Sequence, residues 1–172
     1  MNVFDSDFSK PHSVIENPVA MSEYGKFKIQ CEEVVLELLK ERAVIIRIPA
    51  IWGKNSLRFN VVKNFIQNGG EIEAYCNLKC NNLMDTLLAK QITYIIDHEK
   101  TGIFHLGSTD LITQGKFVQN LITRMANEEM KLPNTYFENQ DEIYYFGLET
   151  NTKDLSEQLQ CTSEVIIEEL CK

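Results

Sequence analysis

The sequence predicts an α/β fold in which a parallel sheet carries helices on its faces. Apolar residues recur at helical spacing between Tyr24 and Leu39, and the opposite side of that segment is charged. A β-branched run over residues 43–53 follows directly, and its interruption by proline and glycine is typical of a buried parallel strand that ends there. A helix followed by a buried strand is half of a βαβ unit. We therefore expect a single α/β domain over residues 1–172.

The rest of the chain alternates between helix and strand patterns. Turn residues separate these patterns, above all Asn68-Gly69-Gly70 after the second helix. Residues 2–5 have the pattern of a strand end, and a parallel strand needs neighbours, so we expect further strands of the same sheet to precede it. The remaining predicted elements are helices over residues 56–67, 83–97, 113–127, 154–160 and 163–170, and strands over residues 71–76, 102–107 and 142–148.

The composition argues against several classes of partner. A formal charge of −8 and the lack of a Lys/Arg cluster disfavour nucleic acid and anionic membranes, because both present phosphates. No apolar run is long enough to span a bilayer, and the first twenty residues lack the pattern of a signal peptide. Five cysteines, an odd number, suit a reduced cytoplasm better than a disulfide framework. We expect a cytoplasmic protein.

Cysteine and histidine residues allow one metal hypothesis. Cys76 and Cys80 could join His98 and His105 as zinc ligands, but their spacing is not that of a zinc finger. His105 falls within the strand predicted over residues 102–107, so we interpret it as structural. We expect no metal site.

Tyr24 and Lys28 form the clearest candidate for chemistry. Their spacing places a phenol and an ammonium on one helical face, where the cation favours release of the phenol's proton. A free phenol titrates near pH 10, so a nearby cation is needed for proton exchange close to neutrality. Tyr75 and Lys79 repeat the spacing, but in a predicted short strand that runs into polar residues. We interpret Tyr75 as structural.

Several fragments, in this order, resemble one known family. They are Val3-Phe4-Asp5, then Pro11 and Glu16, then Tyr24-Gly25-Lys26-Phe27-Lys28, the strand from Arg47 to Trp52-Gly53, Gly102-Ile103-Phe104-His105-Leu106, and the segment over residues 148–155. Together they are similar to the extended short-chain dehydrogenase/reductases that act on nucleotide sugars, in particular the dTDP-4-dehydrorhamnose reductases and the related epimerases and dehydratases. The resemblance spans nearly the whole chain.

The resemblance implies a fold, a reaction and a set of roles. The fold would be the C-terminal part of a Rossmann-like parallel sheet with flanking helices and a small substrate-binding α+β region. The reaction would be the reduction of a 4-keto-6-deoxy sugar nucleotide by NADPH or NADH. Tyr24 would protonate the carbonyl oxygen, and Lys28 would hold the nicotinamide ribose. Pro49 would contact the cofactor and Trp52 the sugar, with core packing as the open alternative for both. Arg47 would bind the substrate or form a structural ion pair.

Two features of that family are missing. The eight glycines form neither Gly-x-Gly-x-x-Gly nor Gly-x-x-Gly-x-x-Gly, so the N-terminal glycine-rich βαβ unit that holds a pyrophosphate is lacking. The family's catalytic Ser/Thr would fall at Met1 or Asn2. We therefore expect the chain alone to be incomplete or inactive. Its truncated sheet should self-associate or need a separate cofactor-binding half.

Two other interpretations stay open. The first is a non-catalytic regulatory or binding protein that derives from such a reductase and has lost the cofactor half. The second is an unrelated α/β domain whose fragments match by chance.

Overall fold

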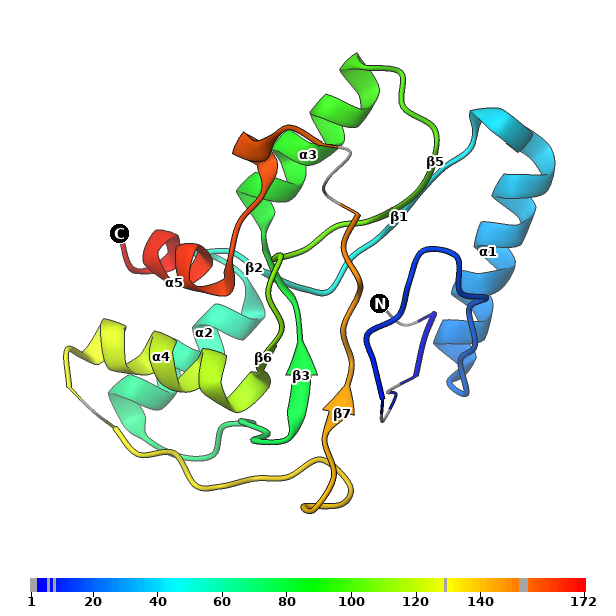
Figure 1. The fold of residues 1–172 in the computed structure, drawn as a ribbon. Coiled ribbons are helices and arrows are strands. Elements are labelled where there is room, and N and C mark those ends of the chain that lie inside the picture. Colours follow the sequence, from blue (N-terminus) through cyan, green and yellow to red (C-terminus); the bar gives the residue numbers. More distant parts are fainter. Residues whose placement is uncertain (1–2, 6, 8, 129, 152–154) are drawn as a thin grey trace.

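Helices flank three small sheets in the computed structural model, which describes residues 3–5, 7, 9–128, 130–151 and 155–172 (Figure 1). Two of the sheets are parallel pairs, so the α/β prediction is confirmed. In the third sheet, the central strand β3 pairs antiparallel with β6 and parallel with β7. The strands are β1 (Val44–Arg47) with β5 (Gly102–His105), β2 (Ala50–Trp52) with β4 (Asn82–Met84), and β3 (Leu78–Cys80) with β6 (Ile112–Thr113) and β7 (Tyr144–Tyr145).

Pro49 divides the predicted strand over residues 43–53 into two strands with different partners. β1 pairs with β5, and after Pro49 the chain continues as β2 beside β4. Proline has no N–H to offer a ladder, so the pairing ends at this residue. The strand partner therefore changes from β5 to β4 where the chain passes from Ile48 to Pro49.

Hydroxyl side chains cap four of the five α-helices. The capping oxygens belong to Ser22, Ser56, Thr113 and Thr162, and each accepts a hydrogen bond from a backbone N–H of the first turn. These caps explain why the helices begin close to the predicted positions. The helices are α1 (Glu23–Leu39), α2 (Leu57–Asn68), α3 (Asp85–Asp97), α4 (Gln114–Ala126) and α5 (Ser163–Cys171), with 3-10 turns at η1 (Lys40–Arg42) and η3 (Glu157–Leu159).

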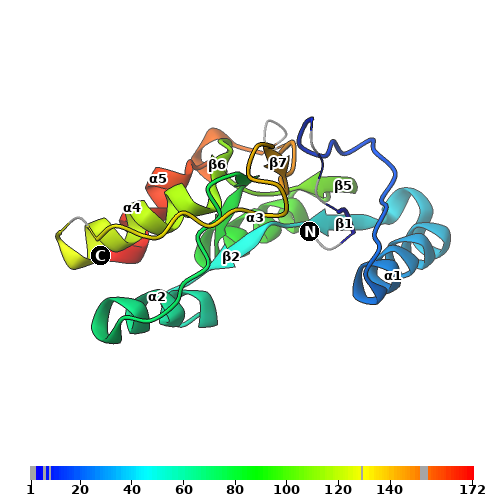
Figure 2. The same cartoon turned by 90° about the horizontal axis from the view of Figure 1, so that it is seen from below.

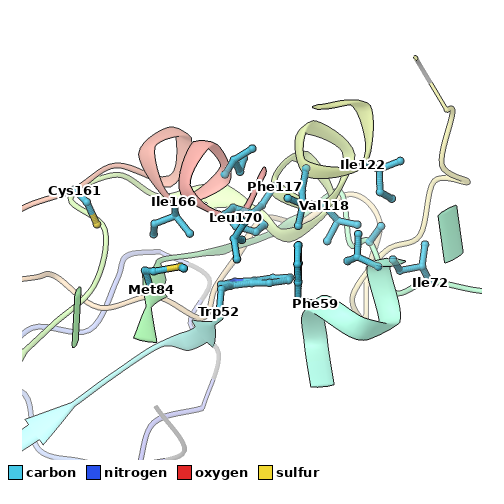
Figure 3. Packing of buried hydrophobic residues seen from close by; sticks show 14 residues of the cluster. Trp52, Phe59, Ile72, Met84, Phe117, Val118, Ile122, Cys161, Ile166 and Leu170 are labelled. Carbon is cyan, nitrogen blue, oxygen red and sulfur yellow. The ribbon is translucent and has the colours of Figure 1, made fainter. Parts of the chain in front are cut away.

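The main core lies where α2, α4 and α5 meet the β2–β4 pair. Figure 3 shows Trp52 on the strand side of this cluster, with Phe117 and Leu170 on the helix side. The rings of Trp52 and Phe117 are 4.7 Å apart. A second cluster joins α3 to the sheet through Leu83, Ile95, Phe104, Leu106 and Leu155.

Helix α1 lies at the opposite end of the molecule from α2, α4 and α5 (Figures 1 and 2). Gly25 is the one buried residue among its 17, whereas α4 buries five. Large apolar side chains of α1 are therefore open to solvent, among them Phe27, Val34 and Leu38. This helix carries the Tyr24–Lys28 pair.

The strand predicted over residues 71–76 is wrong. Ile72 and Ala74 are buried in the main core without a strand, Tyr75 forms a single bridge to Thr135, and the strand β3 starts only at Leu78. The asparagines among the polar residues that follow this predicted strand are buried. Asn77 is 2% exposed, and its Nδ2 donates to the carbonyls of three residues, at positions 137, 139 and 142. Side-chain amides can thus replace ladder hydrogen bonds.

Three further boundaries differ from the prediction. The helix predicted from residue 83 starts at Asp85, because Asn82–Met84 pairs with β2 as a strand. The strand predicted over residues 142–148 covers only Tyr144–Tyr145 in the structure. In place of a helix over residues 154–160 the structure has a 3-10 turn, Glu157–Leu159, and residue 154 lies outside the described residues.

Candidate active site

Tyr24 and Lys28 lie together on the first turns of α1. Ser22 Oγ accepts a hydrogen bond of 3.0 Å from Gly25 N and so fixes where the helix begins. The Lys28 ammonium lies 5.6 Å from the centre of the Tyr24 ring. Because Tyr24 is 56% exposed, its hydroxyl is within reach of a ligand. The arrangement places a phenol and a cation side by side at the surface.

Both side chains line a groove of about 380 Å³ between α1 and β1. Three further residues of α1 line the groove, Cys31, Glu32 and Val35. On the other side it is lined by the consecutive residues 44–48. Successive side chains of a strand point to opposite faces, so a surface that touches five in a row is the strand's edge. The groove therefore follows the free edge of β1.

Arg47 lies at the base of this groove and is held by the protein itself. The ion-pair alternative for this residue is confirmed, since its Nη2 lies 2.8 Å from Glu32 Oε2 and Nε also donates to the same carboxylate. Its Nη1 lies 3.2 Å from Nε2 of His105, and its guanidinium stacks 5.0 Å from the centre of the Phe4 ring. The pair ties α1 to β1 and β5. Contact with a substrate stays a prediction for Arg47.

His105 is fully buried behind Arg47. Burial, and after it the charge of Arg47, lowers the pKa of His105 to about 4. The imidazole is therefore neutral at physiological pH, and Nε2 accepts a hydrogen bond from the guanidinium. His105 acts here as a packing residue with a polar contact, which is the role predicted for it.

The segment before α1 anchors the start of that helix. Phe4 stacks on His12 with ring centres 4.3 Å apart, and His12 Nε2 donates to the Asp5 carbonyl at 2.7 Å. The Asp5 carboxylate accepts from the backbone N of Met21, immediately before the helix cap. These contacts connect the base of the groove to the turn that carries Tyr24.

Pro49 and Trp52 line a second cavity rather than the groove of Tyr24. This cavity has a volume of about 450 Å³ and lies beyond the Ile48–Pro49 step, between β2, β3 and α4. Trp52 is 5% exposed, and its Nε1 donates to Asn82 Oδ1 at 2.9 Å. The roles of Pro49 in cofactor binding and of Trp52 in substrate binding stay predictions. The two cavities follow each other along the chain, because residues 44–48 line the groove and residues 49–52 line the second cavity.

Sequence reasoning missed the polar residues of this second cavity. Arg58 and Gln114 line it together with Phe146 and with Tyr75, which had been interpreted as structural. One signal was available for Arg58, because Ser56 predicts the start of a helix and places Arg58 in its first turn. No local pattern marks Gln114 or Phe146, since they come from distant parts of the chain.

The second Tyr-x-x-x-Lys motif does not form a pair. Lys79 Nζ lies 5.3 Å from the ring centre of Tyr145, and Tyr75 instead donates a hydrogen bond to Glu73. The charge of Glu73 raises the pKa of Tyr75, the opposite of what an activated phenol needs. Tyr24 is therefore the better candidate for proton transfer.

The fit of a dinucleotide to this chain is partial. Tyr24 and Lys28 suit the nicotinamide end, because a phenol and an ammonium face the solvent together. The turn from β2 through Gly53 into α2 is not a pyrophosphate site, because a Cβ at Gly53 would overlap the Asp85 carboxylate. An acidic group that fills the turn leaves no room for a phosphate and repels it.

Two kinds of feature are missing from the part of the chain that the structure describes. No three side chains among its His, Cys, Asp and Glu residues gather in the way that metal ligands do. None of its helices combines the length and the apolar composition needed to cross a membrane.

Comparison with known proteins identifies the family. The family model described as the RmlD substrate binding domain matches residues 2–141. The chain belongs to this family. No curated protein matches the sequence.

Solved structures share the fold of this RmlD family member. A dTDP-4-dehydrorhamnose reductase from Clostridium acetobutylicum is similar with a TM-score of 0.80 and 19% identity, over 97% of this chain and 61% of that one. The Bacillus anthracis dTDP-4-dehydrorhamnose reductase, solved in complex with NADP, has a TM-score of 0.81 and 19% identity, over 98% of this chain and 60% of that one. A UDP-N-acetylglucosamine 4-epimerase from Bacillus cereus has a TM-score of 0.74 and 18% identity, over 99% and 61%. At these identities the likeness shows a Rossmann-like reductase fold.

The chain spans about three fifths of the length of these structures. Roughly two fifths of each has no counterpart among the 172 residues.

Proposed function

We propose that the chain is the substrate-side half of an NAD(P)H-dependent nucleotide-sugar reductase, and that it is incomplete as a catalyst by itself. The observation that carries the proposal is the Tyr24–Lys28 pair, exposed at the groove of a member of the RmlD substrate binding domain family. The NADP complex of the Bacillus anthracis reductase supports a nicotinamide cofactor. Five free cysteines support a reduced, cytoplasmic location.

Tyr24 is the proton donor in this proposal. A nicotinamide held beside this pair would supply the hydride for the keto carbon of the sugar. The Tyr24 hydroxyl gives its proton to the carbonyl oxygen as that oxygen gains negative charge, which completes the alcohol. Lys28 would stabilise the resulting phenolate through its charge. Its ammonium would also hold the cofactor by donating hydrogen bonds to the ribose hydroxyls.

The nucleotide sugar fits the second cavity. Its aromatic wall, which includes Trp52 and Phe146, suits a nucleobase, and the guanidinium of Arg58 suits a diphosphate. Arg47 is assigned a positioning role, because Glu32 and His105 already take its donors. The sugar would then reach across the Ile48–Pro49 step toward Tyr24.

Trp52 offers a direct test of substrate binding, since it is the single tryptophan of the chain. A dTDP-sugar titrated into the protein should change its tryptophan fluorescence with saturation. Arg58→Ala should weaken that binding by about 1 to 3 kcal/mol, whereas Arg124→Ala should not, because Arg124 pairs with Glu164 and does not line the cavity. A wild-type signal that stays flat up to millimolar dTDP-sugar would contradict the substrate assignment.

A regulatory or binding role is the second candidate. The observation that favours it is the Asp85 carboxylate in the β2–α2 turn, which leaves these residues without a pyrophosphate site of their own. A biological effect of the protein that is unchanged in Tyr24→Phe would favour this role. Loss of a measured turnover in the same variant would exclude it.

A further inference from the structure

His12 is buried in the segment before α1 and meets a hydrogen-bond acceptor at each of its ring nitrogens. Its Nε2 lies 2.7 Å from the carbonyl oxygen of Asp5, and its Nδ1 lies 2.9 Å from Oε1 of Glu16. A carbonyl oxygen only accepts, and so does an ionised carboxylate, so both ring nitrogens need a proton to make these two bonds. A neutral imidazole has one N–H and would turn a lone pair toward one of the two oxygens.

The acceptor on the Glu16 side is an ionised carboxylate. Burial raises the pKa of Glu16, but hydrogen bonds from His12 and from the backbone N of Ser13 outweigh this effect and leave that pKa below its ordinary value. The contact between His12 Nδ1 and Glu16 is therefore an ion pair when the imidazole carries two protons. Charge-assisted hydrogen bonds of this kind are roughly twice as strong as neutral ones.

The neighbouring strands add little charge that would oppose a proton on His12. Arg47 is neutralised by Glu32. Burial, and after it the charge of Arg47, lowers the pKa of His105 to about 4, so His105 is neutral. The titratable and charged groups around His12 and its partners are Asp5, Asp7, Lys10 and Glu16 on its own segment, Glu32 on α1, Arg47 on β1, His105 on β5 and Glu149 beyond β7. Among the residues that the structure describes, Glu16 alone offers a side-chain oxygen to the ring.

The main chain of His12 is anchored beside β7. Its backbone N donates to the Gly147 carbonyl at 2.9 Å, and its own carbonyl accepts from the backbone N of Glu149 at 2.8 Å. The ring stacks on Phe4, which lies at the base of the groove. Figure 1 shows this segment between β7 and α1. His12 therefore joins a fixed part of the sheet to the segment that leads into α1.

Asp5 carries the connection from His12 to the turn of Tyr24. The Asp5 carbonyl accepts from His12, while the Asp5 carboxylate accepts from the backbone N of Met21 at 3.1 Å. Met21 directly precedes Ser22, the N-cap of α1, and Tyr24 lies in the first turn of that helix. Two hydrogen bonds and one peptide step thus separate the imidazole from the cap that fixes where Tyr24 stands.

We infer that His12 is a positioning residue for Tyr24, and that it holds the start of α1 only while both of its ring nitrogens carry protons. This inference rests on the proposed function, because Tyr24 needs a fixed position if it transfers a proton. Loss of one proton from His12 breaks the bond to Asp5 or the bond to Glu16, and the segment that ends at Met21 loosens. The order of the first turn of α1 therefore falls as the pH rises.

NMR spectroscopy of the 172-residue chain, titrated from about pH 5.5 to about pH 8.5, tests the inference without a measured turnover. Nitrogen-15 shifts of the imidazole report the protons on His12 directly, and neutral His105 is the internal reference. Amide exchange, corrected for its intrinsic pH dependence, reports the hydrogen bond at Met21 N. When His12 loses a proton, protection at Met21 should fall at least about tenfold, whereas protection at Leu121, in the main core, should not change.

Glu16→Gln is the matched variant, because a glutamine amide can donate a hydrogen bond to a bare Nδ1. A neutral His12 then satisfies both of its partners, so protection at Met21 should stay constant over the whole titration. Glu33→Gln, at an exposed position of α1, should keep the pH dependence of wild type. Circular dichroism checks that both variants are folded, and the wild-type titration decides the outcome by itself if Glu16→Gln does not fold.

Four results would overturn the inference. They are a bare ring nitrogen on His12 at about pH 5.5, protection at Met21 that does not follow the titration of His12, the same pH dependence in Glu16→Gln as in wild type, and an equal loss of protection at Leu121. The last of these would mean that the whole molecule opens rather than the turn before α1.

The role of Tyr24 can fail separately from the role of His12. The nuclear Overhauser effect between the Tyr24 ring and the Lys28 side chain should weaken as His12 loses its proton. A chain that behaves in this way, but turns over equally well as Tyr24→Phe with an added cofactor-binding half, would overturn the proposed function and leave His12 in control of the turn. Turnover that is lost in Tyr24→Phe, in a chain whose Met21 protection ignores the titration, would leave the proposed function standing and overturn the inference about His12.

Discussion

Glu32 holds the buried Arg47 in place in the groove between α1 and β1. Its carboxylate neutralises Arg47, which is 5% exposed. Glu32→Gln would leave a buried guanidinium without a counter-charge, at a cost of about 2 to 4 kcal/mol in the free energy of unfolding. Urea denaturation measures this loss. Glu33→Gln, at an exposed position of the same helix, should stay within about 0.5 kcal/mol of wild type, and equal losses in the two variants would contradict the ion pair as the cause.

His105 predicts a pH dependence of stability. Its pKa is lowered from 6.5 to about 4 in the folded protein, so the unfolded chain binds more protons between these values. The stability is present above pH 6.5 and is lost as the pH falls toward 4, by at most about 3 kcal/mol from this residue. Denaturation between pH 7 and 4.5 should show a smaller loss in His105→Gln than in wild type. His98→Gln, at an exposed residue, should keep the wild-type slope.

At the scale of single elements, the first turn of α1 depends on the N-cap residue Ser22. Ser22→Ala removes the acceptor for Gly25 N and should lower stability by about 1 kcal/mol, while Ser22→Asp should restore it. Because Tyr24 sits in that turn, amide exchange at residues 24–26 should quicken in the alanine variant. Unchanged exchange there would mean that packing, rather than the cap, holds the turn.

The helices should differ in protection from hydrogen exchange. α1 buries Gly25 alone, while α4 buries five residues against the main core. Local opening is cheaper where few apolar contacts are lost, so amides of α1 should exchange faster than those of α4 in the isolated chain. Equal protection of the two helices in the isolated chain would contradict the open groove.

The sequence predicts the helices in which apolar residues recur at regular spacing. It does not predict segments whose backbone is hydrogen-bonded by polar side chains. The helical spacing after Tyr24 and the caps such as Ser56 gave α1, α2, α4 and α5 to within a few residues. Asn77 and Asn81 are two of the polar residues that follow the predicted short strand, yet both are buried and satisfy backbone groups across the chain. Their partners lie up to 67 residues away, so no local pattern could reveal them.

The candidate site was predictable only where it is local. Tyr24 and Lys28 meet because they are four residues apart on one helix. The second cavity joins Arg58, Gln114 and Phe146, which are brought together by tertiary structure alone. The separation of Pro49 and Trp52 from the Tyr24 groove follows from the change of strand partner at Pro49, and the sequence shows the proline but not the new neighbour.

At the scale of the whole molecule, one end of the structure has a closed hydrophobic core and the other end has an open groove. The end with α2, α4 and α5 closes around an aromatic and aliphatic core (Figure 3). At the other end a groove lies open between α1 and β1, and the candidate catalytic pair lines this groove.

The most direct measurement is the oxidation of NADPH, dependent on a dTDP-4-keto-6-deoxy sugar, by the chain in complex with an added cofactor-binding half. The account predicts turnover in wild type, a loss of about 100-fold or more in Tyr24→Phe, and a rate within about threefold of wild type in Tyr136→Phe, since Tyr136 is exposed and lines neither cavity. A wild-type complex without turnover, or a Tyr24→Phe complex as fast as wild type, would contradict the central role of the Tyr24–Lys28 pair.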